Sequence, residues 1–378
     1  MGPRVRESRR ASRGRRVVSG AQEQRPEPGS RREAKELAAE QEWRRAQERA
    51  ERAAAPEAIR RRRLLQAAGG LALAIGVGAS VATPVGQHRA QQWQDPADRE
   101  PAGRPVDRGR HTWGADDERQ TGWLLVPDPE AWGDGSLRPT HPVVVMLHGG
   151  SWHDASDPSY MADLAWDLAA WGVAVWVPTY RGLDGSDGPG GWPETFDDVS
   201  DAVDYVAELG EPGEFSPDLE QVHLLGHSAG GHLAAWALGR DLLPEGAPGS
   251  DCRVIAHSAT AMAGVYDLEL AERSKRGWLV RSLLSGADPD EDPERYEMAS
   301  PIDQLPLDRA VNVLHGRNDA TIPESTTRSY VQRHEETGNS GRIVILDDAD
   351  HDSWVDVHGE PWFRARQALL EQIPSGSA

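Results

Sequence analysis

From Thr121 onward, the sequence alternates short apolar runs with segments of helical periodicity, and this alternation limits the folds open to the chain. The apolar runs are rich in Val, Ile and Leu, as buried parallel strands are: GWLLVP, HPVVVMLH, GVAVWVPTY, QVHLLGH, CRVIAHSAT, AVNVLHG and RIVILDD. Between them, segments such as PSYMADLAWDLAAW and PETFDDVSDAVDYVAELG indicate helices. The pattern predicts an α/β fold with a mostly parallel central sheet flanked by helices.

The residues before this pattern differ from it in charge. Residues 1–63 carry 19 Lys and Arg against 10 Asp and Glu, whereas the rest of the chain carries 22 against 51. The Glu residues interleaved with Arg indicate a solvated helix with many i,i+4 ion pairs. We therefore interpret residues 1–63 as a basic N-terminal arm, disordered or helical, and expect no nucleic-acid partner.

Residues 64–86 form an apolar segment in which only Gln66, Ser80 and Thr83 are polar. Its length is about that needed to cross a hydrocarbon core, and the four arginines at 60–63 form a positive-inside flank. The run RRRLL also resembles a twin-arginine export signal. An export signal cleaved after Ala82 and a permanent anchor both remain open. Either one predicts a membrane-anchored or exported protein whose C-terminal domain lies outside the cytoplasm.

Residues 87–120 are polar and interrupted by prolines without periodicity, which is typical of a linker. We therefore predict one domain over residues 121–374. The single cysteine, Cys252, excludes an intrachain disulfide and a Cys-rich metal site. The acidic segments DDADHD and ADPDEDPERYE are interpreted as a solvated loop and a helix start, so no metal and no cofactor is expected.

The motif GHSAG places Ser228 between a predicted strand and a predicted helix. Gly226 and Gly230 bracket the serine because a Cβ at either position would collide with the neighbouring strand or helix. The tight turn lifts the Ser228 hydroxyl above the sheet at a helix N-terminus, where partial positive charge favours developing negative charge. This context predicts a nucleophilic serine.

A serine hydroxyl needs a base to remove its proton and an acid to orient that base. In this kind of fold, the acid and then the histidine follow the serine along the chain. Asp319 follows the strand candidate AVNVLHG, and His351 follows RIVILDD. Both lie at carboxyl ends of predicted strands, the edge at which an open α/β sheet places its ligands. We predict that Ser228, His351 and Asp319 form a catalytic triad.

Other residues compete for these roles. His315 and His358 are weaker candidates for the base, and Asp267 in GVYDL is a weaker candidate for the acid. His227 and His232 flank the serine on the turn and are interpreted as packing residues.

The segment MLHGGSWH supplies donors for an oxyanion. Its Gly-Gly pair allows backbone N–H groups to turn inward without interference from a Cβ. We predict that the N–H groups of Gly150, Ser151 and Ala229 form the oxyanion hole.

Together, HGGSWH, GGWPETFDDVSDAVDYV, GHSAGGHLAAWA, GVYDL, PERYEMASP and HGRNDATIP with DADH resemble the α/β-hydrolase superfamily. The resemblance covers about residues 121–374 and points to the branch of kynurenine formamidase-like and feruloyl-esterase-like carboxylesterases. It implies an α/β-hydrolase fold and a cofactor-free serine hydrolase with Ser228, Asp319 and His351 as triad. The oxyanion segment here reads HGGS, where lipase-like esterases have HGGG.

Four residues that follow strand ends or the oxyanion segment are predicted to line a substrate pocket, with surface packing as the alternative: Trp152, Tyr180, Arg181 and Trp192. The loop LDGSDGPGGW is too polar to cover a lipid tunnel. We therefore expect a small-molecule substrate, a short-chain acyl ester and in particular an aryl ester. The domain's negative charge is expected to disfavour anionic substrates. The alternatives are an aryl formamidase or amidase and a membrane-tethered, non-catalytic binding protein. The sequence does not indicate whether the protein is a monomer or an oligomer.

Overall fold

The computed structural model describes residues 105–115, 119–127, 140–154, 156, 158–183, 190–210 and 215–374. The predicted basic arm, the apolar segment 64–86 and most of the predicted linker lie outside these residues. Within the described part of the chain, no helix has both the length and the apolar character needed to cross a membrane.

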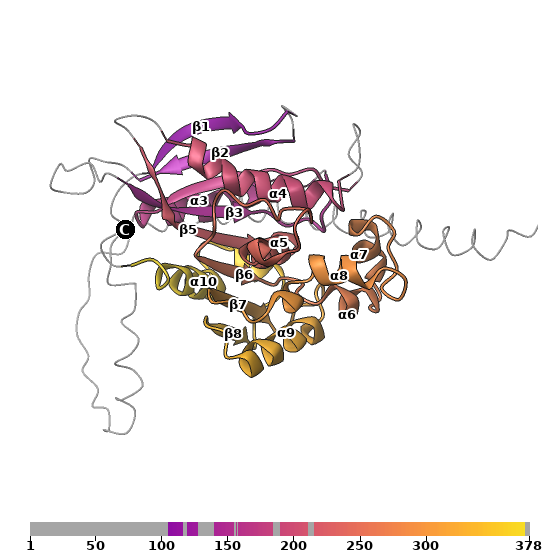
Figure 1. The fold of residues 1–378 in the computed structure, drawn as a ribbon. Helices are drawn as coiled ribbons and strands as arrows, with labels where there is room; N and C mark the ends of the chain where they lie inside the picture. The colour runs from indigo at the N-terminus through magenta and orange to yellow at the C-terminus, as the bar shows by residue number, and fades with distance from the viewer. Residues whose placement is uncertain are drawn as a thin grey trace, which may run out of the picture. The chain divides into compact units, whose positions relative to one another are not determined.

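The described residues form one eight-stranded sheet (Figure 1). Its strands in chain order are β1 (Val106–Thr112), β2 (Thr121–Val126), β3 (His141–Leu147), β4 (Ala174–Pro178), β5 (Pro217–His227), β6 (Ser258–Met262), β7 (Ala310–Gly316) and β8 (Ile343–Leu346). In space the order is β1-β2-β4-β3-β5-β6-β7-β8. The pairs β1/β2 and β2/β4 are antiparallel and every other pair is parallel, so the predicted mostly parallel sheet is confirmed.

Helices cover both faces of this sheet (Figure 1). They are α3 (Ala162–Ala170), α4 (Glu194–Asp204), α5 (Ala229–Leu238), α6 (Leu268–Glu272), α7 (Gly277–Leu283), α8 (Pro293–Ala299), α9 (Glu324–Thr337) and α10 (Glu360–Leu370). Strand β3 shows how the two faces are built, because its side chains alternate between two apolar cores. Val143 and Val145 join the core that contains Phe196 of α4, while Val144 and Met146 join the core of α3 and α10. This two-sided burial explains why the strands are continuously apolar.

The structure differs from the sequence interpretation in three places. Residues 106–112, assigned to the linker, form edge strand β1, whose polar sequence VDRGRHT gives no apolar alternation. Strand β6 begins at Ser258, so the CRVIAH part of the predicted strand precedes it. The short helices α6, α7 and α8 lie between β6 and β7, where no helix was predicted except a start at the acidic segment. There, Asp292 caps α8 by accepting a hydrogen bond from the Arg295 N–H at 3.3 Å.

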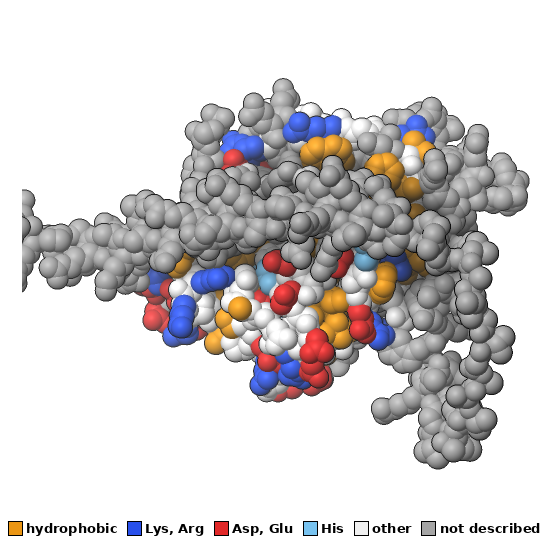
Figure 2. Space-filling view, turned by 180° about the vertical axis from the view of Figure 1, so that it is seen from behind, with side chains coloured by type: hydrophobic (Ala, Val, Ile, Leu, Met, Phe, Trp, Pro, Cys, Tyr) orange, Lys and Arg blue, Asp and Glu red, His pale blue; other side chains and the backbone are white. Residues whose placement is uncertain are grey.

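Acidic and basic side chains are intermixed on the described part of the face shown in Figure 2. Helix α9 carries an exposed i,i+4 pair between Arg328 and Glu324, and α10 carries one between Arg364 and Glu360. Such exposed pairs contribute little stability, so the fold depends mainly on its two apolar cores.

Candidate active site

Ser228 lies on the turn that joins β5 to α5. Its backbone has φ 57° and ψ −119°, a strained conformation for a residue with a side chain. A Cβ on Gly226 would lie 2.0 Å from the Gly230 carbonyl oxygen, and one on Gly230 would lie 2.0 Å from the Leu147 carbonyl oxygen. Both glycines are therefore required by backbone contacts, as predicted from the sequence.

The side chains of Ser228, His351 and Asp319 form one hydrogen-bonded row. His351 Nε2 lies 2.9 Å from Ser228 Oγ, and His351 Nδ1 lies 2.7 Å from Asp319 Oδ2. The three residues come from different parts of the chain: Ser228 follows β5, Asp319 follows β7 and His351 follows β8. Parallel strands bring these positions to one edge of the sheet.

The Asp319 carboxylate is fixed and charged. Its Oδ1 accepts hydrogen bonds from the backbone N–H groups of Thr321 at 2.7 Å and Ile322 at 2.8 Å. Burial raises the pKa of Asp319, but the hydrogen bond and charge of His351 together with the backbone donors outweigh it, so the net pKa is lowered. A charged Asp319 holds the proton of His351 on Nδ1 and leaves Nε2 to accept the serine proton.

The loop after β3 turns sharply beside the serine. Gly150, Ser151 and Trp152 have φ values of 113°, 55° and 58° in succession. The Gly150 carbonyl accepts hydrogen bonds from the His153 N–H at 3.0 Å and the Ser156 hydroxyl at 3.1 Å. Because a peptide plane directs its C=O and N–H in opposite directions, the Ser151 N–H points away from those donors. Ser151 and Ala229 line the same pocket as Ser228, as an oxyanion hole requires.

A second series of hydrogen bonds links the loop after β3 to the backbone of His351. The Tyr160 hydroxyl oxygen accepts a hydrogen bond from the Gly149 N–H at 2.6 Å and lies 3.2 Å from His227 Nδ1. His227 Nε2 lies 2.9 Å from the carbonyl oxygen of His351. Burial, and to a lesser extent the electrostatic influence of the neighbouring His351, lowers the pKa of His227 to about 3, so the His227 ring is neutral.

These contacts determine which atom carries the proton in each hydrogen bond from Gly149 to the His351 carbonyl. The His351 carbonyl only accepts, so His227 carries its proton on Nε2 and donates it there. Nδ1 then accepts from the Tyr160 O–H, and the Tyr160 oxygen accepts from Gly149. His227, interpreted from sequence as a packing residue, thus connects the oxyanion loop with the backbone of the candidate base.

His232 has a similar supporting position. The Trp152 indole N–H donates to His232 Nδ1 at 3.2 Å, and His232 Nε2 donates to the Ala299 carbonyl at 3.0 Å. Burial lowers the pKa of His232 to about 4, which keeps the ring neutral in this role. Trp152 is thereby held against the pocket that it lines.

The competing histidines and Asp267 occupy other positions. His315 is buried, with Nδ1 3.1 Å from the Thr327 hydroxyl and Nε2 3.8 Å from Asp319 Oδ2. His358 is exposed. Asp267 caps α6 by accepting from the Leu270 N–H at 2.9 Å and accepts from the Ser329 hydroxyl at 2.8 Å. Its carboxylate is thus engaged in local structure.

Three of the four predicted pocket residues do not line the pocket at Ser228. Tyr180 is buried, stacks on His148 and donates its hydroxyl to the His148 carbonyl at 2.7 Å. Arg181 forms an ion pair of 2.6 Å with the fully buried Asp198. Trp192 packs on Phe196 of α4 with ring centroids 5.0 Å apart. A position just after a strand end is shared by residues that pack inside the domain and residues that line a pocket, so it did not separate the two. Of the four predicted residues, only Trp152 lines the pocket at Ser228.

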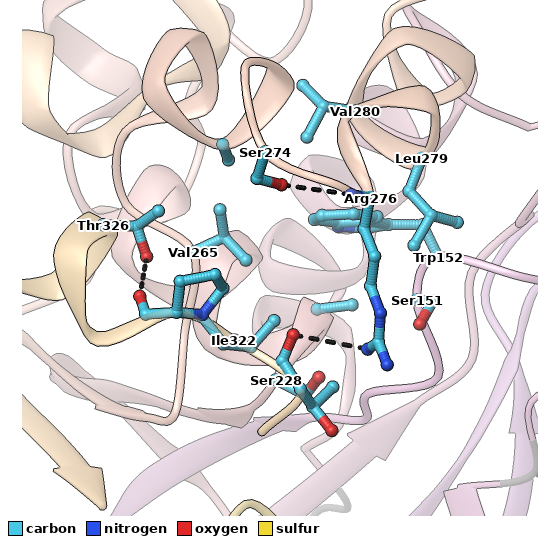
Figure 3. A pocket seen from close by; sticks show the side chains of 14 residues that line it. Ser151, Trp152, Ser228, Val265, Ser274, Arg276, Leu279, Val280, Ile322 and Thr326 are labelled. Atoms are coloured by element: carbon cyan, nitrogen blue, oxygen red, sulfur yellow. Dashed lines mark hydrogen bonds between the residues drawn. The ribbon is translucent and has the colours of Figure 1, made fainter. Parts of the chain in front are cut away.

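The pocket encloses about 490 Å³, counting space open to solvent, and is drawn in Figure 3. Its apolar walls come from loop residues after the strands and from α6 and α7, and most of these residues were missed from sequence. The lining consists of Ser151, Trp152, Ser228, Ala229, Val265, Ala271, Ser274, Arg276, Leu279, Val280, Thr321, Ile322, Pro323 and Thr326. The only available signal was the long insertion at 263–309 between two strands, which does not reveal which side chains turn inward.

The strand order, the strained serine turn and the Ser-His-Asp row define an α/β-hydrolase with a serine-hydrolase site. A family model described as BD-FAE matches residues 135–333, and the chain belongs to this family. A probable isoprenylcysteine alpha-carbonyl methylesterase ICME of Oryza sativa is 27% identical over 62% of this chain and 56% of its own length. A probable carboxylic ester hydrolase LipM of Mycobacterium tuberculosis is 28% identical over 53% of this chain and 46% of its own. The chain thus spans about half the length of the curated relatives it matches.

Solved structures show the same fold. A truncated carbohydrate esterase from gut microbiota superposes with a TM-score of 0.59 at 17% identity, covering 72% of this chain and 98% of that one. Esterase 2 of Thermogutta terrifontis, solved with propionate bound, gives 0.55 at 19% identity, covering 70% and 92%.

The chain from Gly149 through Tyr160 to His227 predicts a measurable effect of removing one hydroxyl. Tyr160→Phe leaves the Gly149 N–H and His227 Nδ1 without this partner, at a cost of about 1–3 kcal/mol. We expect kcat on an aryl ester to fall about tenfold with little change in KM. Tyr296→Phe is the matched control, because its hydroxyl bonds only the Ala287 carbonyl at 3.1 Å within the described residues. Equal kcat for Tyr160→Phe and the control would contradict the positioning role.

Proposed function

We propose that this protein is a serine esterase that cleaves short-chain acyl esters, aryl esters among them, through an acyl-enzyme. The observation that carries the proposal is the row in which His351 Nε2 lies 2.9 Å from Ser228 Oγ and Nδ1 lies 2.7 Å from Asp319. The BD-FAE family and the ester hydrolases among the relatives support the same reaction class.

The reaction proceeds in two halves. His351 removes the Ser228 proton as Oγ attacks the ester carbonyl, and the resulting oxyanion is stabilised by the N–H groups of Gly150, Ser151 and Ala229. The C–O bond then breaks, and His351 gives its proton to the departing alcohol. In the second half, His351 activates a water molecule that attacks the acyl-enzyme, which releases the acid and restores Ser228. Asp319 stabilises the imidazolium in both halves.

The pocket supports short acyl groups. Val265, Leu279, Val280 and Ile322 provide an apolar wall near Ser228, and the volume of about 490 Å³ includes the open mouth. An aryl formamide or amide remains the second candidate substrate class, since the same attack on an amide carbonyl requires only that His351 protonate the leaving nitrogen. An activity assay with matched aryl esters and formamides ranks the two classes.

The triad predicts two different outcomes for two Asp substitutions. Asp319→Asn should lower kcat about ten-thousandfold, because the imidazole then adopts the wrong tautomer. Asp267→Asn, the matched control at a helix cap, should leave kcat within a few fold.

Ser228→Ala should abolish labelling by a fluorophosphonate probe without loss of the circular dichroism signal. Wild-type labelling of Ser228→Ala would identify a different nucleophile.

The pocket size predicts the chain-length dependence of ester hydrolysis. For 4-nitrophenyl esters, kcat/KM should be greatest for acyl chains of a few carbons and should decline beyond about eight carbons, when the chain outgrows the pocket. Steady-state kinetics over a series from acetate to dodecanoate measures this. A kcat/KM that continues to rise to the longest chain would require an acyl channel deeper than the described pocket.

We further propose that residues 64–86 anchor the protein in a membrane or direct its export, with the hydrolase domain outside the cytoplasm. The apolar length of the segment and the arginines that precede it support this. Protease added to intact cells of the native host should digest the hydrolase domain if it is anchored, and culture medium should contain it if it is released. Retention inside cells together with resistance to protease until lysis would refute the proposal.

A further inference from the structure

His315, near the end of β7, is a buried imidazole beside the proposed triad that the reaction described above does not use. Its side chain and that of Asp319 are both fully buried. His315 Nε2 lies 3.8 Å from Asp319 Oδ2, the same oxygen that His351 Nδ1 contacts at 2.7 Å. Two histidines therefore face one oxygen of the catalytic carboxylate, and only one of them has been given a role.

The surroundings of His315 place its proton on Nε2. Nδ1 lies 3.1 Å from the hydroxyl of Thr327 on α9. Nε2 has no hydrogen bond of ordinary length among the described residues, and it is the ring nitrogen that faces Asp319. An unprotonated Nε2 would direct a lone pair at the negative carboxylate, whereas an N–H there is attracted to it. The Thr327 hydroxyl therefore donates to Nδ1, and Nε2 carries its proton on the side of Asp319.

The His315 ring is neutral. Burial lowers the pKa of His315, and the attraction of Asp319 offsets this only in part. The ring thus acts on its neighbours as a dipole and not as a full charge. Because His315 and Asp319 are both buried, water screens this dipole little.

The dipole affects the base through the acid. Asp319 Oδ1 is held by the backbone N–H groups of Thr321 and Ile322, and Oδ2 accepts from His351. The Nε2–H of His315 adds positive potential at Oδ2. That potential stabilises the carboxylate but opposes the appearance of a second positive charge on His351. His315 therefore makes the base less ready to hold a proton of its own.

Charged and titratable groups from other elements also face this cluster. Glu324 of α9 and Arg276 of the loop before α7 act on it electrostatically, and the ring centroid of His227 lies 4.8 Å from that of His351. Substitution of His315 leaves these three groups in place. A change in pH dependence that follows the substitution therefore reports on His315.

We propose that His315 is a positioning residue that acts on His351 through Asp319 and extends the activity of the protein to lower pH by keeping His351 unprotonated. This inference rests on the proposed esterase function. It also gives Thr327 a part, because the hydroxyl of Thr327 selects the tautomer in which His315 presents an N–H to the acid.

The test removes the Nε2–H and then restores it. His315→Phe fills the space of the ring without any N–H, and His315→Asn keeps a polar group near the Nδ1 position, where Thr327 can contact it. In His315→Gln, the longer side chain carries its amide to the Nε2 position and keeps an N–H there. The matched control is His334→Asn, which removes Nε2 from a buried histidine of α9 that lies 3.1 Å from the Ser340 carbonyl.

The readout is kcat/KM for 4-nitrophenyl acetate as a function of pH. His315→Phe and His315→Asn should move the midpoint of the acid limb upward by about half a pH unit and leave the plateau at higher pH within about threefold of wild type. His315→Gln should return the midpoint to that of wild type, and His334→Asn should not move it.

Two results would overturn the proposal. A loss of plateau activity without a shift of the midpoint would mean that His315 only supports the fold, and a downward shift would reverse the sign of its effect. Circular dichroism identifies a variant that does not fold. If His315→Phe fails in this way, the comparison of His315→Asn with His315→Gln decides the question.

A measurement without turnover separates this inference from the esterase proposal. The His351 Nδ1 proton shared with Asp319 is followed by its downfield ¹H NMR resonance, which is identified by its loss in His351→Gln. His315→Asn should move this resonance further downfield, because Oδ2 then accepts more strongly from His351, and His315→Gln should not. That movement in a protein that a fluorophosphonate does not label would refute the esterase and retain the role of His315. Labelling with an unmoved resonance and an unmoved acid limb would do the opposite.

Discussion

The close approach of backbones beneath Ser228 is the constraint on which the rest of the site depends. Gly226, Gly230 and the carbonyl of Leu147 lie so near one another that a Cβ at either glycine would come within 2.0 Å of a backbone oxygen. This contact brings the ends of β3 and β5 and the start of α5 to one point. As a result, the serine and the oxyanion loop are positioned by main-chain packing, and only the base and the acid must be supplied by other loops.

The features that could be predicted from the sequence are those that leave a pattern in neighbouring residues or in the order of residues along the chain. The parallel strands were predictable because burial on both faces makes them continuously apolar, as β3 illustrates. The order of serine, acid and histidine along the chain in this fold predicted that Ser228, Asp319 and His351 act together. The structure places their side chains in a hydrogen-bonded row, with His351 Nε2 2.9 Å from Ser228 Oγ and His351 Nδ1 2.7 Å from Asp319 Oδ2. Strand β1 escaped prediction because an edge strand with a polar sequence lacks that periodicity.

The pocket was the least predictable part because its lining depends on tertiary placement. Tyr180 and Arg181 follow a strand end as pocket residues often do, yet one stacks on His148 and the other pairs with buried Asp198. Arg276 lies on the loop between two short helices and Val280 lies on the second of them, and no local sequence pattern indicates that these residues line the pocket at Ser228. His227 could not be assigned from sequence either, since its role is defined by the His351 carbonyl, more than a hundred residues away in the chain.

Much of the pocket lining comes from a single segment of the chain, and this affects how the substrate selectivity of such a protein can evolve. Residues 263–309 leave the sheet after β6 and return to it at β7, and this one excursion provides Val265, Ala271, Ser274, Arg276, Leu279 and Val280. The proposed nucleophile, base, acid and oxyanion loop all lie outside this segment. Under the proposed function, much of the pocket wall and the reacting groups are therefore encoded in separate stretches of the gene, so that insertions, deletions or recombination within residues 263–309 can alter which molecules enter while the proposed catalytic residues are inherited intact.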